Sequence, residues 1–600
     1  MTEVTAGNEP YILDFVPDEV CIIVEAPFNL EGRQLYSDAL RLLNTRLPQH
    51  IRSVAAEPGH PVAEDLTFSN LSERIDESGG NLFQRLGRGG IEADASAAQT
   101  DAGVRAPWVV FHRGDSAAAE WHLYYQVGPD RLDLLTSPID RRHQRLASIR
   151  QLANLMNVRA LGIGEDLGDQ NWRVVGASPN WLTTAHDFSC AGPASLPAPE
   201  TRTGRWRFHF ADPIREALRS QPVNSDVVVA VLDTCPDLSH VQVNPDSYLE
   251  QVWHDVHSDA AQQYAMQRGY FDRPGGVDAY VGNCVAWWHE NMPRDADSRQ
   301  RFNMADHGLF ASGIVHDIAR DDGCEIRLIR VLNDYGVGDL LAIAHVLRAL
   351  PENLLAERSS RGPKHLIVNL SLGAVPSQVK HRARWLPAVH RGLDASGSVT
   401  VPEAAQHLLD AAHLNLKGTI DWLHRQDVLV VASAGNDALR DFTRGHVPPP
   451  RYPARYEHVF GVSATSASGE AAIYANRADV SPLGNGIATF GGDAIKPQHP
   501  TEAANTETGT TRLGREQAVV GVFSSEKLPG GAINHTGWGQ WAGTSFAAPV
   551  VSGLAARAWA RMGSSSADQI LAWTRSVASR SSATHALDAP VLEAWQVHEP

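Results

Sequence analysis

The chain has 600 residues, of which 43% are hydrophobic and 20% are charged, and its formal net charge is −17. This length allows several domains, and the composition is typical of a globular protein with a large core. The acidic charge argues against general binding of nucleic acids or anionic membranes, so neither is expected as a partner.

The start of the chain and its cysteines predict a cytoplasmic protein. Residues 1–11 are polar and acidic, without the basic start and apolar centre of a secretory signal. No run of about 18 apolar residues is present, so no membrane span is expected. The five cysteines are scattered and lack C-x-x-C spacing, which suggests neither a disulfide framework nor a zinc site.

Residues 1–195 predict a small α+β domain. Residues 60–106 are rich in Gly, Ala, Ser, Asp and Glu, which indicates a flexible loop inside this domain. A Pro-rich stretch closes the domain, and we expect residues 196–204 to be a linker. Strands are expected within 12–24 and at 108–111, 121–125, 132–135 and 172–175, and helices at 30–47 and 141–158.

From residue 205 onward, strands alternate with helices such as those expected at 340–350 and 404–424. The short apolar runs fit strands that are buried on both faces of a parallel sheet. Residues 205–580 therefore predict a doubly wound α/β domain, with its ligand site at the carboxyl ends of the strands. Residues 581–600 are expected to be a C-terminal tail. The predicted strands are 227–232, 326–332, 366–370, 428–432 and 459–462.

Four polar residues stand at the ends of these elements. Asp233 ends the first strand, His307 opens a helix, and Asn436 ends the fourth strand. Ser545 lies among small residues just before an Ala-rich apolar run, and Pro549 fits a first helical turn there. At such a helix start, free N–H groups and the helix dipole favour negative charge near the serine hydroxyl.

In this order and context, the four motifs resemble those of the subtilisin-like serine proteases, the subtilase family, over about residues 205–580. Agreement of four separated motifs rarely arises by chance. The resemblance implies a serine endopeptidase that acts on proteins or peptides and needs no cofactor. Residues 1–195 lie outside it, although many members carry an N-terminal propeptide.

The resemblance implies a role for each of the four residues. His307 would take the proton of the Ser545 hydroxyl, a poor nucleophile at neutral pH, and later protonate the leaving amine. Asp233 would hold the imidazole in the right tautomer and stabilise its cation. The Asn436 amide and the Ser545 N–H would bind the oxyanion, and such a donor is worth ~3–4 kcal/mol. Alone, each residue is unremarkable, so only the set indicates catalysis.

The resemblance also implies where substrate binds. Two segments would form opposite walls of the pocket for the residue before the cut: Ser371-Leu372-Gly373 and Ser433-Ala434-Gly435. Arg451 takes the position of the pocket floor, where members often have a small residue. Its guanidinium could pair with a substrate carboxylate, which would favour cutting after Asp or Glu and make residues 91–95 a candidate self-processing site. The alternative is that Arg451 points into solvent.

The sequence departs from the family pattern in three places. Cys235 stands where members usually have glycine, and we expect it to be a small buried residue beside the site. The calcium loop often found between the equivalents of His307 and Val331 is missing, so no metal is predicted. The long insertion after Asp233 contains His254 and His257, whose spacing could mark a metal site, although a lid or recognition loop is the stronger expectation.

Two other functions are compatible with the sequence. One is a catalytically silent subtilase fold that serves as a binding scaffold, although the intact set of four residues argues against it. The other is a switchable protease whose N-terminal domain senses an upstream activator.

Overall fold

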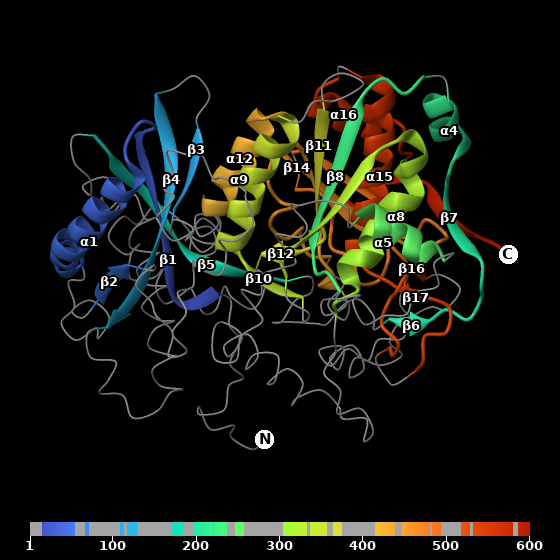
Figure 1. Cartoon of the computed structure of the whole chain (residues 1–600), viewed down its shortest axis with the longest axis horizontal. Coiled ribbons are helices and arrows are strands. Elements are labelled where there is room, and N and C mark those ends of the chain that lie inside the picture. Colours follow the sequence, from blue (N-terminus) through green and yellow to red (C-terminus); the bar gives the residue numbers. More distant parts are fainter. Residues whose placement is uncertain are drawn as a thin grey trace.

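The chain forms two large β-sheets, one antiparallel and one parallel, with helices between and beside them (Figure 1). The antiparallel sheet belongs mainly to the N-terminal region, and the parallel sheet belongs to the remainder of the chain. This computed structural model describes residues 15–54, 66–70, 108–112, 117–129, 171–184, 197–219, 221–236, 247–256, 304–332, 336–356, 364–374, 414–438, 447–480, 483–493, 518–528, 532–563, 565–579 and 586–600.

The parallel sheet has the strand order β18-β15-β14-β13-β11-β8-β9. Each neighbouring pair runs in the same direction, so the carboxyl ends of all seven strands meet at one edge. Together with the helices on its faces, this sheet confirms the predicted α/β fold. The strands are β8 (Asp226–Asp233), β9 (Glu325–Arg330), β11 (Lys364–Leu370), β13 (Leu429–Ser433), β14 (Val459–Thr465), β15 (Gly486–Phe490) and β18 (Val591–Leu592).

Helices cover both faces of this sheet. α8 (His307–Ala319) and α15 (Thr544–Met562) pack together on one face, and both are buried along almost their whole length. α9 (Leu340–Ala356) and α12 (Leu414–Arg425) cover the other face, where they lie between the two sheets (Figure 1). Shorter helices are α4 (Asp212–Arg219), α5 (Tyr248–Val256), η6 (Arg320–Asp322) and α16 (Ala567–Ser576).

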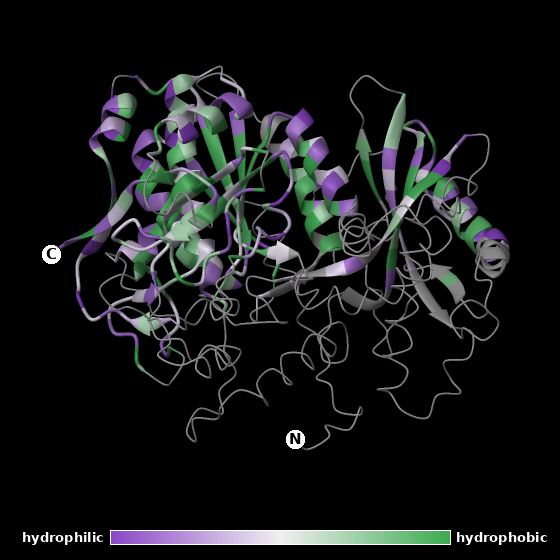
Figure 2. Ribbon diagram, turned by 180° about the vertical axis from the view of Figure 1, so that it is seen from behind, coloured by the Kyte–Doolittle hydropathy of each residue, from purple (hydrophilic) through white to green (hydrophobic). Residues whose placement is uncertain are grey.

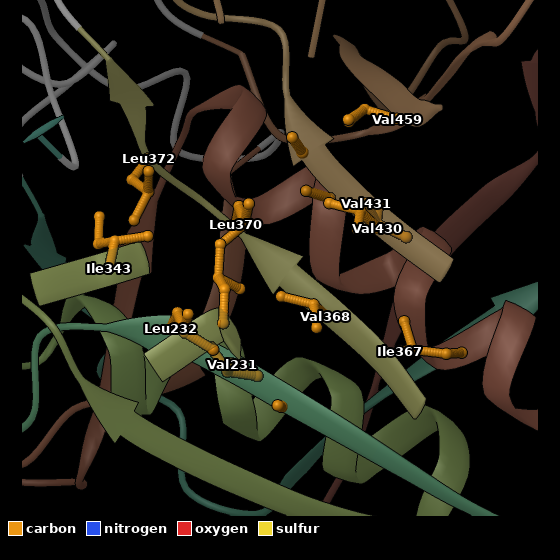
Figure 3. Close-up of a cluster of buried hydrophobic side chains, with 14 of the residues drawn as sticks. Val231, Leu232, Ile343, Ile367, Val368, Leu370, Leu372, Val430, Val431 and Val459 are labelled. Carbon is orange, nitrogen blue, oxygen red and sulfur yellow. The ribbon is translucent and has the colours of Figure 1, made fainter. Parts of the chain in front are cut away.

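The centre of the parallel sheet is apolar on both sides, as its short hydrophobic runs predict. Val231, Ile367, Val368 and Val431 are buried, and their side chains extend from adjacent strands toward the flanking helices (Figure 3). The hydropathy colouring shows the same strands mostly in green (Figure 2). Burial of this kind contributes about 25 cal/mol per Å² of apolar surface, so the sheet is a rigid platform for the polar groups at its edge.

The N-terminal sheet is antiparallel and follows the path β10-β5-β1-β4-β2, with β3 paired to β4. Helix α1 (Gly32–Val54) covers its outer face, where Tyr36 stacks on Tyr125 and donates a hydrogen bond to the Tyr124 carbonyl at 2.6 Å. The predicted α+β character of this region is confirmed. Its strands are β1 (Phe15–Pro27), β2 (Leu66–Asn70), β3 (Trp108–His112), β4 (Ala118–Pro129) and β5 (Arg173–Thr184).

Two short strands from the α/β region complete the N-terminal sheet. β10 (Val337–Asp339) and β12 (Gly373–Ala374) both pair antiparallel with the end of β5. Thr184 lies opposite Val337 on one side and Gly373 on the other. The end of β5 is therefore held between two segments of the α/β region.

Three expected irregular segments contain strands instead. Residues 591–599, expected in a C-terminal tail, form β18 and β19 (Ala594–Glu599), and β19 pairs with β7 (Arg205–Phe210). The expected linker contains β6 (Ala198–Pro199), which pairs with β17 (Trp538–Trp541), itself paired with β16 (Val519–Val522). The expected loop 60–106 contains β2. Pairing with distant segments orders these stretches, and local composition does not reveal such partners.

Some expected elements lie outside the described residues, namely the strand at 132–135, the helix at 141–158 and the first part of the helix at 404–424. Pro549 lies in the second turn of α15, not in the first turn as expected. Within the part of the chain that the structure describes, no helix is long and apolar enough to cross a membrane.

Candidate active site

Asp233 and His307 meet at the carboxyl edge of the parallel sheet. His307 Nδ1 lies 2.8 and 3.0 Å from the two carboxylate oxygens of Asp233, and both side chains are buried. An ionised carboxylate can only accept hydrogen bonds, so this contact places the imidazole proton on Nδ1 and leaves Nε2 as an acceptor. That tautomer can remove a proton from a neighbouring hydroxyl.

Thr234 fixes the start of α8 against the end of β8. Its hydroxyl donates to the carbonyls of Met304 and Ala305 at 3.0 and 2.9 Å and accepts from Gly308 N–H at 3.0 Å. The Thr234 N–H in turn donates to Asp233 Oδ1 at 2.7 Å. One residue thus orients both the carboxylate and the first turn of the helix that carries His307.

Gly308 permits this close approach of α8 to β8. A methyl group added at Gly308 would lie 2.1 Å from the Thr234 carbonyl oxygen and 2.8 Å from Asp233 Cβ. Both distances are far below van der Waals contact, and the nearer atom belongs to the backbone, which cannot rotate away. The absence of a side chain therefore sets the separation of the Asp233 and His307 backbones.

Two apolar rings lie against His307, and the carboxylate of the preceding residue anchors the chain there. Its ring makes an edge contact with Trp541 and a tilted contact with Phe546, with centroids 5.4 and 5.2 Å apart. The buried carboxylate of Asp306 accepts hydrogen bonds from the N–H and hydroxyl groups of both Ser524 and Ser525. The residue before His307 is therefore tied to a loop from a distant part of the sequence. No local pattern in the sequence indicates a role for Asp306, because its partners lie more than 200 positions away.

Ser545 lies in the first turn of α15, beside the end of β11. Its hydroxyl donates to the Ser371 carbonyl at 3.4 Å, and the Ser371 hydroxyl donates to the Ser545 carbonyl at 2.8 Å. Pro549 explains the second bond: it has no N–H with which to fill the Ser545 carbonyl four residues earlier. Both the hydroxyl and the carbonyl of Ser545 are therefore hydrogen-bonded to Ser371, the first residue of the segment predicted to bind substrate.

The structure brings Ser545 and His307 to the same edge but pairs the serine hydroxyl with Ser371. Between these two described side chains there is no hydrogen bond. Rotation of the hydroxyl away from a 3.4 Å contact breaks only one weak bond. Catalytic hydrogen bonds are often long or misaligned until substrate is bound, so this geometry is compatible with the predicted roles.

Asn436 is oriented by the residue before Ser545. Its Oδ1 accepts hydrogen bonds from Thr544 N–H and from the Thr544 hydroxyl, each at 3.0 Å. Because the oxygen is engaged in this way, the amide NH₂ group faces away from Thr544 and remains a donor. Such a donor beside the N–H groups that open α15 can bind an oxyanion.

The two predicted wall segments flank this arrangement. Gly435 N–H donates to the Thr544 hydroxyl at 3.1 Å, and Gly435 has φ +106°, a backbone conformation that favours glycine. The side chains of the two segments, those of Ser371, Leu372, Ser433 and Ala434, are all buried. The glycines of the segments, Gly373 and Gly435, face one side chain in common, that of Arg451.

Arg451 does not point into solvent. Its Nε donates to Asp437 Oδ2 at 2.6 Å, a second guanidinium nitrogen pairs with Asp437 Oδ1, and only 9% of the side chain is exposed. A substrate carboxylate would therefore have to compete with Asp437 for this guanidinium. Although Asp437 directly follows Asn436, nothing in the sequence indicates that its carboxylate pairs with Arg451, 14 positions later.

The other residues predicted to matter near the site are a cysteine, two histidines and a candidate self-processing segment. Cys235 is buried and directly follows Thr234, as expected for a small residue beside the site. His254 lies on α5 with most of its side chain exposed, whereas His257 and residues 91–95 lie outside the described residues. Among the residues that are described, no three His, Cys, Asp or Glu side chains are grouped as a metal ion would require.

Comparison with known proteins identifies the family. The family model of the subtilases matches residues 224–590, and the chain therefore belongs to the subtilase family. Among solved structures, the prenylagaramide maturation protease PagA is similar to 64% of this chain and 96% of its own, with 16% sequence identity and a TM-score of 0.33. No curated protein matches the chain.

We predict that Gly308→Ala destabilises the protein more than Gly313→Ala does. Both glycines lie on α8, but a methyl group at Gly313 would meet the Val522 side chain, which can shift, whereas at Gly308 it meets backbone. Overpacking typically costs about 1–3 kcal/mol, and Gly308→Ala should reach or exceed that range. Thermal unfolding of both variants measures the difference. Equal unfolding temperatures would contradict the proposed constraint.

Proposed function

We propose that this chain is a serine endopeptidase in which Ser545 is the nucleophile, His307 the general base and Asp233 its orienting partner. The observation that carries the proposal is the buried contact of His307 Nδ1 with Asp233, at the same sheet edge as a serine that opens a helix. The intact set and its orientation favour an enzyme over a catalytically silent scaffold.

The proposed reaction is acyl transfer in two halves. Ser545 Oγ attacks the carbonyl carbon of the scissile peptide bond while His307 Nε2 takes its proton. The oxyanion accepts hydrogen bonds from the Asn436 amide and the Ser545 N–H, and Asp233 stabilises the imidazolium. His307 then gives the proton to the leaving amine. Water, activated by the same imidazole, hydrolyses the acyl-enzyme and restores Ser545.

The N-terminal domain is proposed to restrain this activity. The end of β5 pairs with Gly373-Ala374, which begins two residues after Ser371, the residue that contacts Ser545. It pairs on its other side with Val337–Asp339. Extended peptides bind sheet edges through the same main-chain hydrogen bonds, so β5 and a substrate would compete for these edges.

Helices α9 and α12 form the rest of the contact with the N-terminal domain. Arg348 Nε donates to the Val110 carbonyl at 2.7 Å, and its guanidinium lies over the ring of Trp422, which also contacts Phe111. Leu341 N–H donates to Asn180 Oδ1 at 3.1 Å. Buried aromatic contacts with paired polar groups are typical of a stable association.

We predict that a fluorophosphonate probe labels the wild-type chain but not Ser545→Ala. Ser576→Ala is the control, because Ser576 is an exposed serine at the end of α16 whose hydroxyl donates to the Trp573 carbonyl of the same helix. The His307→Ala and Asp233→Ala variants should lose peptide hydrolysis by roughly 10⁴-fold or more. Labelling of Ser545→Ala at the wild-type rate would refute the assignment. Absence of labelling both in the folded wild type and in Gly418→Leu, the variant described below that loosens the N-terminal domain, would favour the scaffold.

We also predict that Gly418→Leu raises peptide hydrolysis. Gly418 lies on α12 against the N-terminal domain, and a methyl group there would already overlap the Glu120 carboxylate and approach buried His122. A leucine should push the domains apart and expose the edges paired with β5. Its control is Lys417→Leu on the exposed face of the same helix, which should hydrolyse peptides at the wild-type rate. Unchanged hydrolysis in Gly418→Leu, with faster proteolysis of the loosened N-terminal domain, would contradict restraint by this domain.

A further inference from the structure

The Arg451 side chain occupies the space between the two wall segments. A methyl group added at Gly435 would lie 2.9 Å from Arg451 Cδ, and one at Gly373 would lie 3.5 Å from the same atom. The Arg451 N–H also donates to the Ala434 carbonyl at 2.9 Å. The aliphatic stem of Arg451 thus packs between the two glycines, and no larger residue fits at Gly435 without moving it.

This space adjoins the reacting groups. Gly435 directly precedes Asn436, and Gly373 lies two residues after Ser371, whose carbonyl accepts from Ser545 Oγ. A peptide that is attacked by Ser545, with its carbonyl oxygen turned to Asn436, must therefore place the side chain before the cut near both segments. The stem of Arg451 limits how far that side chain can extend.

Asp437 keeps Arg451 in place. Its carboxylate takes both guanidinium bonds and also accepts from Asn476 Nδ2 at 2.7 Å, while Asn476 Oδ1 accepts from Asp437 N–H at 2.8 Å. The exposed fractions of the Arg451 and Asp437 side chains are 9% and 11%. Displacing the arginine would leave a largely buried carboxylate without its cation, which is strongly unfavourable.

We propose that the Arg451–Asp437 pair restricts this protease to substrates with a small residue, Gly, Ala or Ser, immediately before the cleaved bond. The pair acts as a specificity device: its arginine fills the volume that a larger side chain would need, and its aspartate occupies the guanidinium that would attract an acidic one. This inference rests on the proposed peptidase function and names the substrate class of the same site.

The test is a set of peptides that differ only at the residue before the cut, with Ala, Ser, Leu, Phe, Asp and Glu compared by kcat/KM on the full chain. Ratios between peptides are unaffected by the fraction of molecules that the N-terminal domain restrains. The wild type should prefer Ala over Leu, Phe, Asp and Glu by at least about tenfold, the discrimination that a mismatch of one or more methylenes can produce. In the double variant Arg451→Ala, Asp437→Asn, the ratio of Phe to Ala should rise by about tenfold or more, because the space is opened and no unpaired charge remains.

The matched control is Arg455→Ala, which removes an arginine from the same turn, where its guanidinium lies over Tyr452, and should keep the wild-type ratios. A wild type that cuts after Leu or Phe as well as after Ala overturns the proposal, and so does a preference for Asp or Glu. An unchanged Phe to Ala ratio in a folded double variant does the same. These outcomes differ from failure of the proposed function, in which neither the wild type nor Gly418→Leu reacts with a fluorophosphonate or cuts any peptide, and which overturns both proposals.

Discussion

The site depends on the contact between the end of β8 and the beginning of α8. A buried carboxylate is costly unless its oxygens are paired, and Asp233 obtains its partners from the imidazole of His307 and the N–H of Thr234. These bonds require the helix to start almost against the strand, which Gly308 allows because it has no side chain. The contact between β8 and α8 therefore also fixes the geometry of the Asp233–His307 pair, and the apolar core on both sides of the sheet makes this arrangement rigid.

A second coupling joins Ser545, the proposed nucleophile, to the end of β11, where the segment predicted to bind substrate begins. Pro549 removes the helical donor from the Ser545 carbonyl, and Ser371 supplies a hydroxyl in its place. Asn369 fixes that hydroxyl at 2.9 Å and accepts from Ser552 further along α15. The helical hydrogen bond that Pro549 cannot make is thus replaced by a hydrogen bond from Ser371, which links α15 to the end of β11. Ser545 and the segment that begins at Ser371 are consequently fixed in position relative to each other, as a reaction at Ser545 with a peptide bound to that segment requires.

The sequence predicts most of the fold and a set of four candidate catalytic residues, because both leave local signals. Runs such as 227–232 and 428–432 are apolar throughout, as strands buried on both faces must be. Asp233 ends β8 and His307 opens α8, whereas Asn436 lies three residues beyond the end of β13 and Ser545 is the second residue of α15. Contacts between distant segments leave no such signal. The pairing of β19 with β7, the contacts of Asp306 with Ser524 and Ser525, and the ion pair of Arg451 with Asp437 depend on the folded chain. Composition at 581–600 therefore suggested a tail, and the charge of Arg451 suggested a substrate contact.

The contacts of the N-terminal domain with the α/β domain indicate which of them would control the proposed enzyme. β10 and β12 each pair with β5 over only two or three residues, so the strand contact alone contributes few hydrogen bonds. A net hydrogen bond is worth about 1 kcal/mol, which a substrate strand could match. The contacts of α9 and α12 with the N-terminal sheet bury Trp422 and Phe111, and a substrate does not replace them. In the proposed mode of restraint, a substrate can therefore compete with β5 for the edges of β10 and β12, but it cannot replace the contacts that α9 and α12 make with the N-terminal domain. An activator would have to act on the helix contact, and β5 would then leave the edges because its own pairing is too short to hold it there.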